Sequence, residues 1–224
     1  MTYLPKNDLL QVDFLNEVFN NTTNGYKFYW FWAILDEITL HDKNEIEIPE
    51  LSITMMSLVW YPLDYYKLSF GKQDGFKKLA SSISEKMHIH RGSSNFNLRD
   101  ELNSLDNLGL IEEIKKESTV LLNRWVAYRF LRPFFDSQLQ GIKDQYVNSS
   151  IRELANKNIG LAPYSFDGDK IVLDTNWKIY LQKHQYILRG FIKWHLLKFV
   201  QKNNPNIIGL SFYRKNLKSL HLEI

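Results

Sequence analysis

The sequence predicts an α+β fold that is predominantly α-helical, with a buried aromatic helix at its centre. Three observations predict it. An unbroken apolar run, YWFWAIL, occupies residues 29–35. An Asp167-Gly168 pair between two short apolar runs is a strong signal for a small β-hairpin. After residue 174 begins the longest helical pattern of the chain, and its polar residues are basic.

The composition is that of an ordinary globular protein, with 224 residues of which 44% are hydrophobic and 24% charged. The absence of cysteine excludes disulfides, a thiolate nucleophile and a cysteine zinc site. The six histidines are scattered, and none forms the paired spacing of a zinc-binding helix. Residues 1–13 carry charges throughout, unlike a signal peptide, so we expect a cytoplasmic protein without a membrane segment.

The central helix is expected to begin at residues 22–24 (TTN), because each of them is a good N-cap residue. From residue 26 to 35 only Lys27 is polar, so the helix is apolar around most of its circumference and Lys27 is expected to reach the surface. The acidic pair at 36–37 is expected to end it. Residues 4–19 carry a helical apolar stripe and are expected to pair with it as a helical hairpin.

The next expected helix covers residues 51–61 and is ended by Pro62. A short amphipathic helix is expected over residues 76–83, beyond a polar turn. Between these two helices we expect a loop lined by aromatic residues, namely Trp60, Tyr61, Tyr65 and Tyr66.

The following segment has the outline of a winged helix-turn-helix. A recognition helix over residues 97–107 would be followed by one strand at 110–114 and a second at 119–122 or 125–131. The expected recognition helix carries three acids beside Arg99, which makes it a poor reader of the major groove. We therefore expect a structural module here, with DNA reading by this element as the alternative.

The rest of the chain is expected to form helices at residues 134–145 and 151–156, then the hairpin at 164–173. A cap at residues 174–176 then starts a helix that runs to residue 202. Gly190, in its middle, indicates close packing or a bend. Five polar positions of this helix follow steps of four, three, four and four and so form one basic rail, namely Lys178, Gln182, Gln185, Arg189 and Lys193.

The expected organisation is an aromatic-core helical region (1–91), a helix-and-hairpin module (92–174) and a basic helix with its tail (175–224), or one compact unit that holds all three. Residues 175–224 contain nine basic residues and one acid, a net charge of +8. Residues 1–174 contain 19 basic and 24 acidic residues, a net charge of −5. This asymmetry indicates a polyanionic partner for the C-terminal segment, with a merely solvated basic helix face as the alternative.

Four long blocks, rich in Trp and Tyr, carry a resemblance. They are NNTTNGYKFYWFWAIL (20–35), VWYPLDYYKLSFGKQD (59–74), VAYRFLRPFF (126–135) and IYLQKHQYILRGFIKWHLLKFVQKNNPNI (179–207). In this order they resemble a group of bacterial proteins that carry an HNH endonuclease domain at their C-terminal end. The nuclease motif of that group begins with an Asp-His pair, which does not occur in this sequence. The resemblance therefore implies the non-catalytic N-terminal region of such a protein, of restriction or defence type.

The function that this resemblance implies is DNA targeting or domain positioning, without catalysis by this polypeptide alone and without a cofactor. The expected partner is double-stranded DNA, with an HNH nuclease domain or another protein as a further partner. Basic side chains would contact phosphates, a contribution that is independent of base sequence. The residues expected to do so are Lys178, Arg189, Lys193, Lys198, Lys202, Arg214, Lys215 and Lys218.

Two other functions stay open at this point. One is a helical protein-interaction module, or a truncated orphan copy, whose aromatic loops bind a protein. The other is a metal-dependent nuclease, because Glu113-Ile-Lys115 has the E-x-K form of such enzymes, with Asp100 or Asp106 as the partner carboxylate. In that case the carboxylates would hold Mg²⁺ and Lys115 would orient the attacking water.

Overall fold

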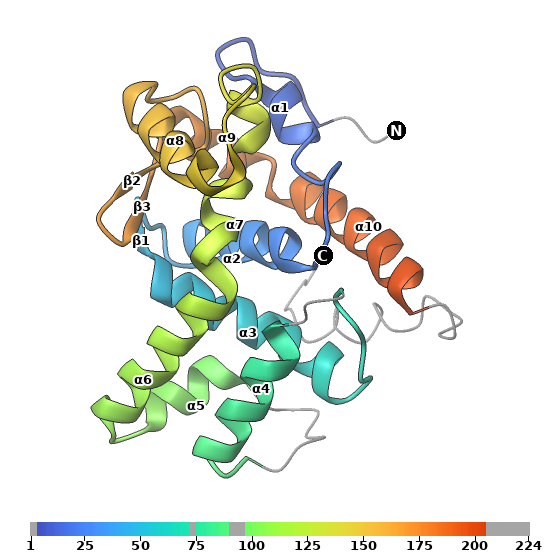
Figure 1. The fold of residues 1–224 in the computed structure, drawn as a ribbon, viewed down its shortest axis with the longest axis vertical. Coiled ribbons are helices and arrows are strands. Elements are labelled where there is room, and N and C mark those ends of the chain that lie inside the picture. Colours follow the sequence, from blue (N-terminus) through green and yellow to red (C-terminus); the bar gives the residue numbers. More distant parts are fainter. Residues whose placement is uncertain (1–3, 72–74, 90–96, 205–224) are drawn as a thin grey trace.

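The computed structural model describes residues 4–71, 75–89 and 97–204. Helices predominate, with a small antiparallel sheet at one edge, so the predicted helix-rich α+β class is confirmed (Figure 1). The strands are β1 (Glu45–Glu47), β2 (Tyr164–Asp167) and β3 (Lys170–Leu173). The helices of the described part are α1 (Val12–Asn16), α2 (Tyr26–Leu40), α3 (Ile48–Asp64), α4 (Gly75–Lys86), α5 (Leu98–Ser104), α6 (Leu108–Ser118), α7 (Arg124–Arg129), α8 (Asp144–Lys157), α9 (Thr175–Lys183) and α10 (Gln185–Asn203), with a π-helical turn η1 (Thr119–Asn123) and a 3-10 turn η2 (Arg132–Phe135).

Helices α2 and α3 pack on each other at the centre, and the remaining helices gather around this pair (Figure 1). The helices α7, α9 and α10 pack on α2, whereas α4, α5 and α6 pack on α3. The sheet has the strand order β1-β3-β2, so β1 from the first quarter of the chain pairs with the hairpin near residue 170. Ile46 lies opposite Ile171, and both side chains are fully buried.

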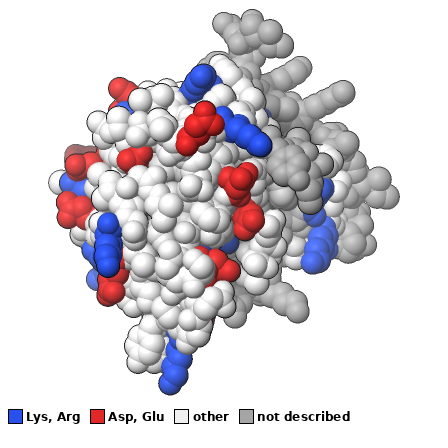
Figure 2. All heavy atoms as spheres, turned by 90° about the horizontal axis from the view of Figure 1, so that it is seen from above, with Lys and Arg blue, Asp and Glu red and all other residues white. Residues whose placement is uncertain are grey.

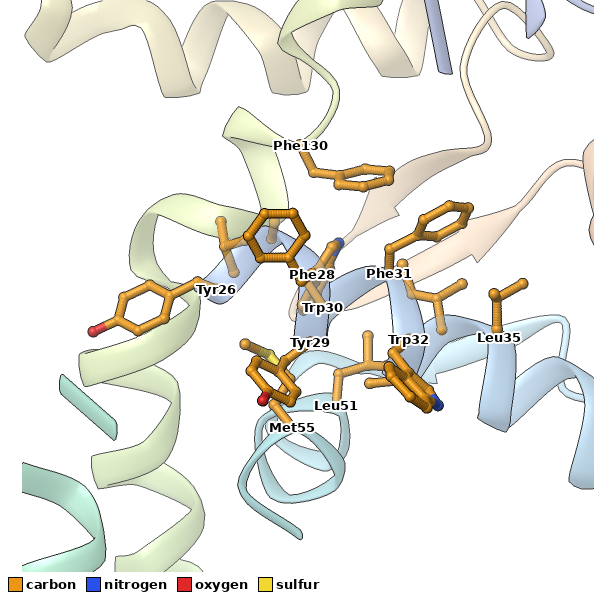
Figure 3. Close-up of a cluster of buried hydrophobic side chains, with 14 of the residues drawn as sticks. Tyr26, Phe28, Tyr29, Trp30, Phe31, Trp32, Leu35, Leu51, Met55 and Phe130 are labelled. Carbon is orange, nitrogen blue, oxygen red and sulfur yellow. The ribbon is translucent and has the colours of Figure 1, made fainter. Parts of the chain in front are cut away.

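The predicted central helix is confirmed as α2, in which twelve of fifteen residues are buried. Its aromatic side chains point to several sides of the helix and fill the space between its neighbours (Figure 3). The Asn24 side chain accepts the Tyr26 N–H at 3.2 Å, close to the predicted cap. The helix does not end at residues 36–37 as predicted. It continues to Leu40, because both acids are buried against basic partners from other elements.

A buried hydrogen-bond chain ties α2 to the sheet. Trp30 Nε1 donates to the Tyr164 hydroxyl at 2.9 Å, and that hydroxyl donates to the carbonyl of Ala127 at 2.6 Å. Burial raises the pKa of Tyr164 well above its usual value, so the hydroxyl stays a donor at any physiological pH. Three elements, α2, β2 and α7, are thereby held in register around one phenol.

The predicted helical hairpin of residues 4–19 with the central helix is wrong, because only α1 is helical there. The Asn16 side chain accepts the Leu4 N–H at 3.0 Å and holds the preceding segment in a non-helical path. The α1 helix packs on η2, with the Phe14 and Phe134 rings 5.8 Å apart.

The second predicted helix is confirmed as α3, but Pro62 does not end it. The helix passes through Pro62 to Asp64, which is possible because proline removes a single hydrogen bond in the last turn. Trp60 is therefore buried in α3 instead of lining a loop. The predicted helix at 76–83 is confirmed as α4.

The predicted winged-helix outline is wrong beyond its first helix. The helix expected over 97–107 is confirmed as the shorter α5. The segments expected as strands, 110–114 and either 119–122 or 125–131, lie mainly in the helical elements α6, η1 and α7. Their buried residues recur in steps of four, which is a helical period. The stripe consists of Ile114, Ser118, Leu122, Val126 and Phe130.

The last predicted elements are partly correct. The hairpin is confirmed as β2 and β3, with Gly168 at a φ of 53° in the turn. The two helices expected at 134–145 and 151–156 are instead the short turn η2 and a single helix α8. Gly141, with a φ of 77°, marks the turn between them.

Candidate nucleic-acid interface

The predicted phosphate-binding residues lie mainly on α9 and α10. The predicted cap of α9 is confirmed, since the Asp174 carboxylate accepts the N–H groups of Asn176 and Trp177 at 3.0 Å each. The sequence predicts one helix to residue 202, but a break at His184 separates α9 from α10. At the end of α10 the Asn204 side chain bonds the backbone N–H and carbonyl of Ser69, which fixes this end against the segment after α3.

The five residues of the basic rail are expected to share one face, and that face is turned toward α2. Lys178 Nζ lies 2.7 Å from both the Asp42 carbonyl and Asn44 Oδ1, and 2.8 Å from the Asp42 carboxylate. Only 11% of its side chain is exposed. Lys178 therefore secures the turn between α2 and β1, where Asp42 has a φ of 51°. Its ammonium group is already occupied.

Arg189 is also occupied within the fold. Its guanidinium donates to Asp36 Oδ1 at 2.5 Å and to Thr39 Oγ1 at 3.0 Å. The two charged side chains are 13% and 9% exposed. Burial raises the pKa of Asp36, and the nearby positive charge of Arg189 opposes this effect. Arg189 thus neutralises a buried carboxylate of the central helix.

Lys193 occupies an intermediate position at the rim of the same interface. Its Nζ lies 5.4 Å from the centroid of the Trp32 ring, within cation–π distance. Partial burial and the charge of Arg189 lower the pKa of Lys193. Lys193 can reach an incoming phosphate only at the edge of α10.

The remaining cations of this segment lie on the opposite side of the helices. Lys198 and Lys202 are exposed on α10, and so is Lys183 at the end of α9, which the sequence interpretation did not single out. Trp194 is 49% exposed, and Lys198 Nζ lies 4.6 Å from the centroid of its ring. The four-residue spacing of Trp194 and Lys198 was the signal available in the sequence. The other three predicted contacts lie outside the described residues, namely Arg214, Lys215 and Lys218.

One face of the molecule mixes the two signs of charge. On the top of the molecule as drawn in Figure 1, where α1, α8 and α9 are labelled, basic and acidic side chains of the described residues are interspersed (Figure 2). By contrast, residues 175–203 contain no acid at all. The outer side of α9 and α10 is therefore the best candidate for contact with a polyanion.

The predicted recognition helix α5 uses its basic residue internally. Arg99 donates to the Glu37 carboxylate at 2.6 Å. Glu37 is fully buried, accepts a second hydrogen bond from Thr54 at 3.0 Å, and lies 3.0 Å from Lys43 Nζ. Although burial opposes it, hydrogen bonds from Arg99 and Lys43 keep the pKa of Glu37 below its usual value. The arrangement anchors α5 and α2 to each other.

The E-x-K residues lie on helix α6 instead of a strand. Glu113 is paired with Lys86 at 2.8 Å, whereas Lys115 is paired with Glu112 at 3.3 Å. Residues two apart on a helix do not face each other, so Glu113 and Lys115 do not share a site. Within the described ranges no three His, Asp or Glu side chains come together as metal ligands. The geometry does not support the metal-dependent nuclease hypothesis.

Lys27 is a partly buried cation of the central helix. The sequence predicts that its side chain reaches the surface, but its Nζ instead donates to the Val18 carbonyl at 3.0 Å. Burial, with repulsion from Arg132 and Arg129, lowers the pKa of Lys27 to about 8. The folded protein therefore binds fewer protons than the unfolded chain between about pH 8 and the ordinary lysine pKa of 10.5.

We expect Lys27→Met to raise the free energy of unfolding at pH 7 by about 2 kcal/mol, since the variant avoids the cost of a buried charge and loses one hydrogen bond. The cost is fully present below the folded pKa and is relieved as pH rises, so the advantage of the variant should shrink toward pH 10. Urea denaturation of both proteins at pH 7, 8.5 and 9.5 measures this difference in the free energy of unfolding. Lys78→Met, at an exposed lysine of α4, is the control and should show no such trend. A constant difference between the wild type and Lys27→Met would contradict the proposed burial cost.

No family model, no curated protein and no solved structure matches this chain. No helix of the described residues has the length and apolar character that crossing a membrane requires.

Proposed function

We propose that this chain is a DNA-binding region that uses the outer side of α10 and the basic residues that follow it. The observation that carries the proposal is the net charge of +8 on residues 175–224, against −5 on the rest of the chain. Lys178 and Arg189 are engaged within the fold, so they are not part of the proposed contact. The proposed phosphate contacts are Lys193, Lys198, Lys202, Arg214, Lys215 and Lys218.

The resemblance of four sequence blocks to HNH-endonuclease proteins supports a role in targeting a nuclease of restriction or defence type in the cytoplasm. In this proposal the chain positions DNA and a separate nuclease domain performs hydrolysis. The buried networks of Asp36 and Glu37 support it from the structural side, because they fix α10 and α5 on the central helix. A rigid helix that presents its outer side suits a positioning role.

The test is binding of a fluorescent duplex of about 30 base pairs, measured by anisotropy at about 50 mM salt, where phosphate contacts dominate. The double variant Lys198→Glu/Lys202→Glu should weaken binding by at least tenfold. The matched control is Lys116→Glu/Lys157→Glu, which reverses two exposed charges in the last turns of α6 and α8. Equal effects of the two variants would refute the proposed surface. Addition of Mg²⁺ should produce no cleavage by this chain alone.

A protein-interaction function is the second candidate, and one feature favours it. Tyr61, Tyr65 and Tyr66 form a cluster at the end of α3, with ring centroids 5.0 to 5.5 Å apart. Tyr65 is 49% exposed, and exposed tyrosines are frequent in protein interfaces. If the chain fails to bind duplex DNA at low salt, this cluster becomes the preferred site, and Tyr65→Ala should then reduce binding of the partner.

A further inference from the structure

The outer side of α10 presents apolar and basic groups in one line. Ile187, Gly190, Trp194 and Lys198 follow steps of three, four and four, so they share one side of the helix. Ile187 is 50% exposed and Trp194 is 49% exposed. Tyr186, beside this line, is 68% exposed. Helix α10 lies at the edge of the fold, so its outer side faces away from α2 (Figure 1).

Gly190 has no explanation within the fold. It is exposed in the middle of a helix of 19 residues, where glycine is unfavourable relative to alanine. A Cβ at this position would meet no atom within 4 Å. The sequence indicates close packing or a bend here, but the structure shows neither, since α10 is continuous from Gln185 to Asn203. A bare stretch of backbone between two exposed aromatic residues suits the close approach of a ligand.

The charges around this line have one sign. No acid occurs between residues 175 and 203, and Lys183, Lys198 and Lys202 are exposed. Lys198 Nζ stands 4.6 Å from the centroid of the Trp194 ring, so a cation and an aromatic surface occur together. An anionic ligand that carries flat apolar rings would satisfy both kinds of group.

We infer that the outer side of α10, centred on Trp194 and Gly190, binds the unpaired bases of a single-stranded nucleic acid. Sequence-independent proteins for single strands combine basic side chains on the phosphates with aromatic side chains on which bases stack. Here Tyr186 and Trp194 are the stacking residues, two helical turns apart, and Gly190 leaves the backbone between them open. The inference rests on the proposed DNA-binding function and adds a substrate class to it, namely strands with exposed bases. An acidic protein helix is the competing occupant, and single-strand binding that depends on Trp194 would rule against it.

The experiment compares a fluorescent oligothymidine of about 30 nucleotides with a duplex of equal length at about 50 mM salt, using the full chain. Trp194→Ala should weaken binding of the single strand by about 5- to 150-fold, the range found for loss of one stacking residue. Duplex binding should change by less than about twofold, because phosphate contacts do not depend on stacking. The matched control is Trp125→Ala on α7, since Trp125 is 46% exposed and lies 5.6 Å from Arg129.

A second variant separates ligand binding from folding. Gly190→Leu should raise the melting temperature, because leucine favours a helix and has open space here, and should still weaken single-strand binding by covering the bare backbone. If Gly190 had only a structural role, its replacement would not raise the melting temperature and weaken single-strand binding at the same time. If Trp194→Ala and Trp125→Ala affect single-strand binding equally while duplex binding persists, the inference is wrong and the proposed function stands. If neither Trp194→Ala nor Gly190→Leu changes the affinity for either nucleic acid, the inference is wrong, because neither residue then contacts a strand. If the chain binds neither nucleic acid, both proposals fail.

Discussion

Arg189→Ala is expected to lower the free energy of unfolding at pH 7 by about 3–5 kcal/mol, the cost of leaving a buried charge without its partner. Asp36 is 9% exposed, and its carboxylate accepts a hydrogen bond from Arg189 at 2.5 Å. In the variant this carboxylate stays on the central helix without its ion-pair partner, and only the more distant charge of Arg99 still favours its ionised form. Urea denaturation, followed by circular dichroism, measures the loss.

The pH dependence of this variant has a definite sign. Burial already raises the pKa of Asp36 in the wild type, and removal of Arg189 should raise it further. A folded-state pKa above the unfolded value means that the cost of the charged form is relieved as pH falls through it. The deficit of Arg189→Ala should therefore be smaller at pH 4.5 than at pH 7. Lys198→Ala, an exposed cation on the same helix, should change stability by less than about 0.5 kcal/mol at either pH. A small loss of unfolding free energy for Arg189→Ala that does not vary with pH would contradict this prediction, because it would show that Arg189 does not stabilise the ionised Asp36.

The parts of the fold that the sequence predicts correctly are those with a strong local signal. The aromatic run of α2 is apolar on every side, and a helix of this kind is stable only when it is buried in a core. Asp174 and the Asp167-Gly168 pair act on backbone groups within three residues, so their effects do not depend on distant contacts. α4 has a clear amphipathic period and is predicted to within a turn.

The errors arise where a distant partner decides the outcome. Asp36 and Glu37 predict a helix end on local grounds, but their partners Arg189 and Arg99 lie 153 and 62 residues further along the chain. Residues 110–131 allow both a strand and a helix pattern. Ser118, a polar member of the buried stripe, obscures the four-residue period, and its hydroxyl is satisfied by the Ile114 carbonyl at 2.7 Å.

The candidate site shows the same limit. Trp177, Leu181, Leu188 and Phe191 are apolar residues of α9 and α10, and all four are buried, as their hydrophobicity indicates. The sequence does not indicate that the basic rail also faces the interior. The acidic residues that pair with the rail lie far away in the sequence, and a local pattern contains no information about them. Conversely, hydrophobicity alone would place Trp194 inside, where the structure has it half exposed. The outer side of α10 emerges only once the position of α2 is known.

Duplex binding is expected to weaken by about 10³-fold between about 50 and 200 mM salt, if the six proposed cations contact phosphates. Each phosphate contact contributes about −0.9 to the slope of log K against log salt, so six contacts give a slope of about −5. The eight residues that the sequence predicts would give about −7. The measured slope therefore tests whether Lys178 and Arg189 stay bound to Asp42 and Asp36 when DNA is present.

The variant Lys198→Glu/Lys202→Glu sharpens this measurement. Loss of two contacts should reduce the magnitude of the slope by about two, so that the same change of salt weakens binding by only about 10²-fold. Lys116→Glu/Lys157→Glu should leave the slope unchanged, because those lysines lie on α6 and α8. A wild-type slope near −7 would place Lys178 and Arg189 on DNA and require α9 and α10 to separate from α2. A slope near zero would leave the basic segment without a phosphate partner, and the tyrosine cluster of α3 would then be the surface to test.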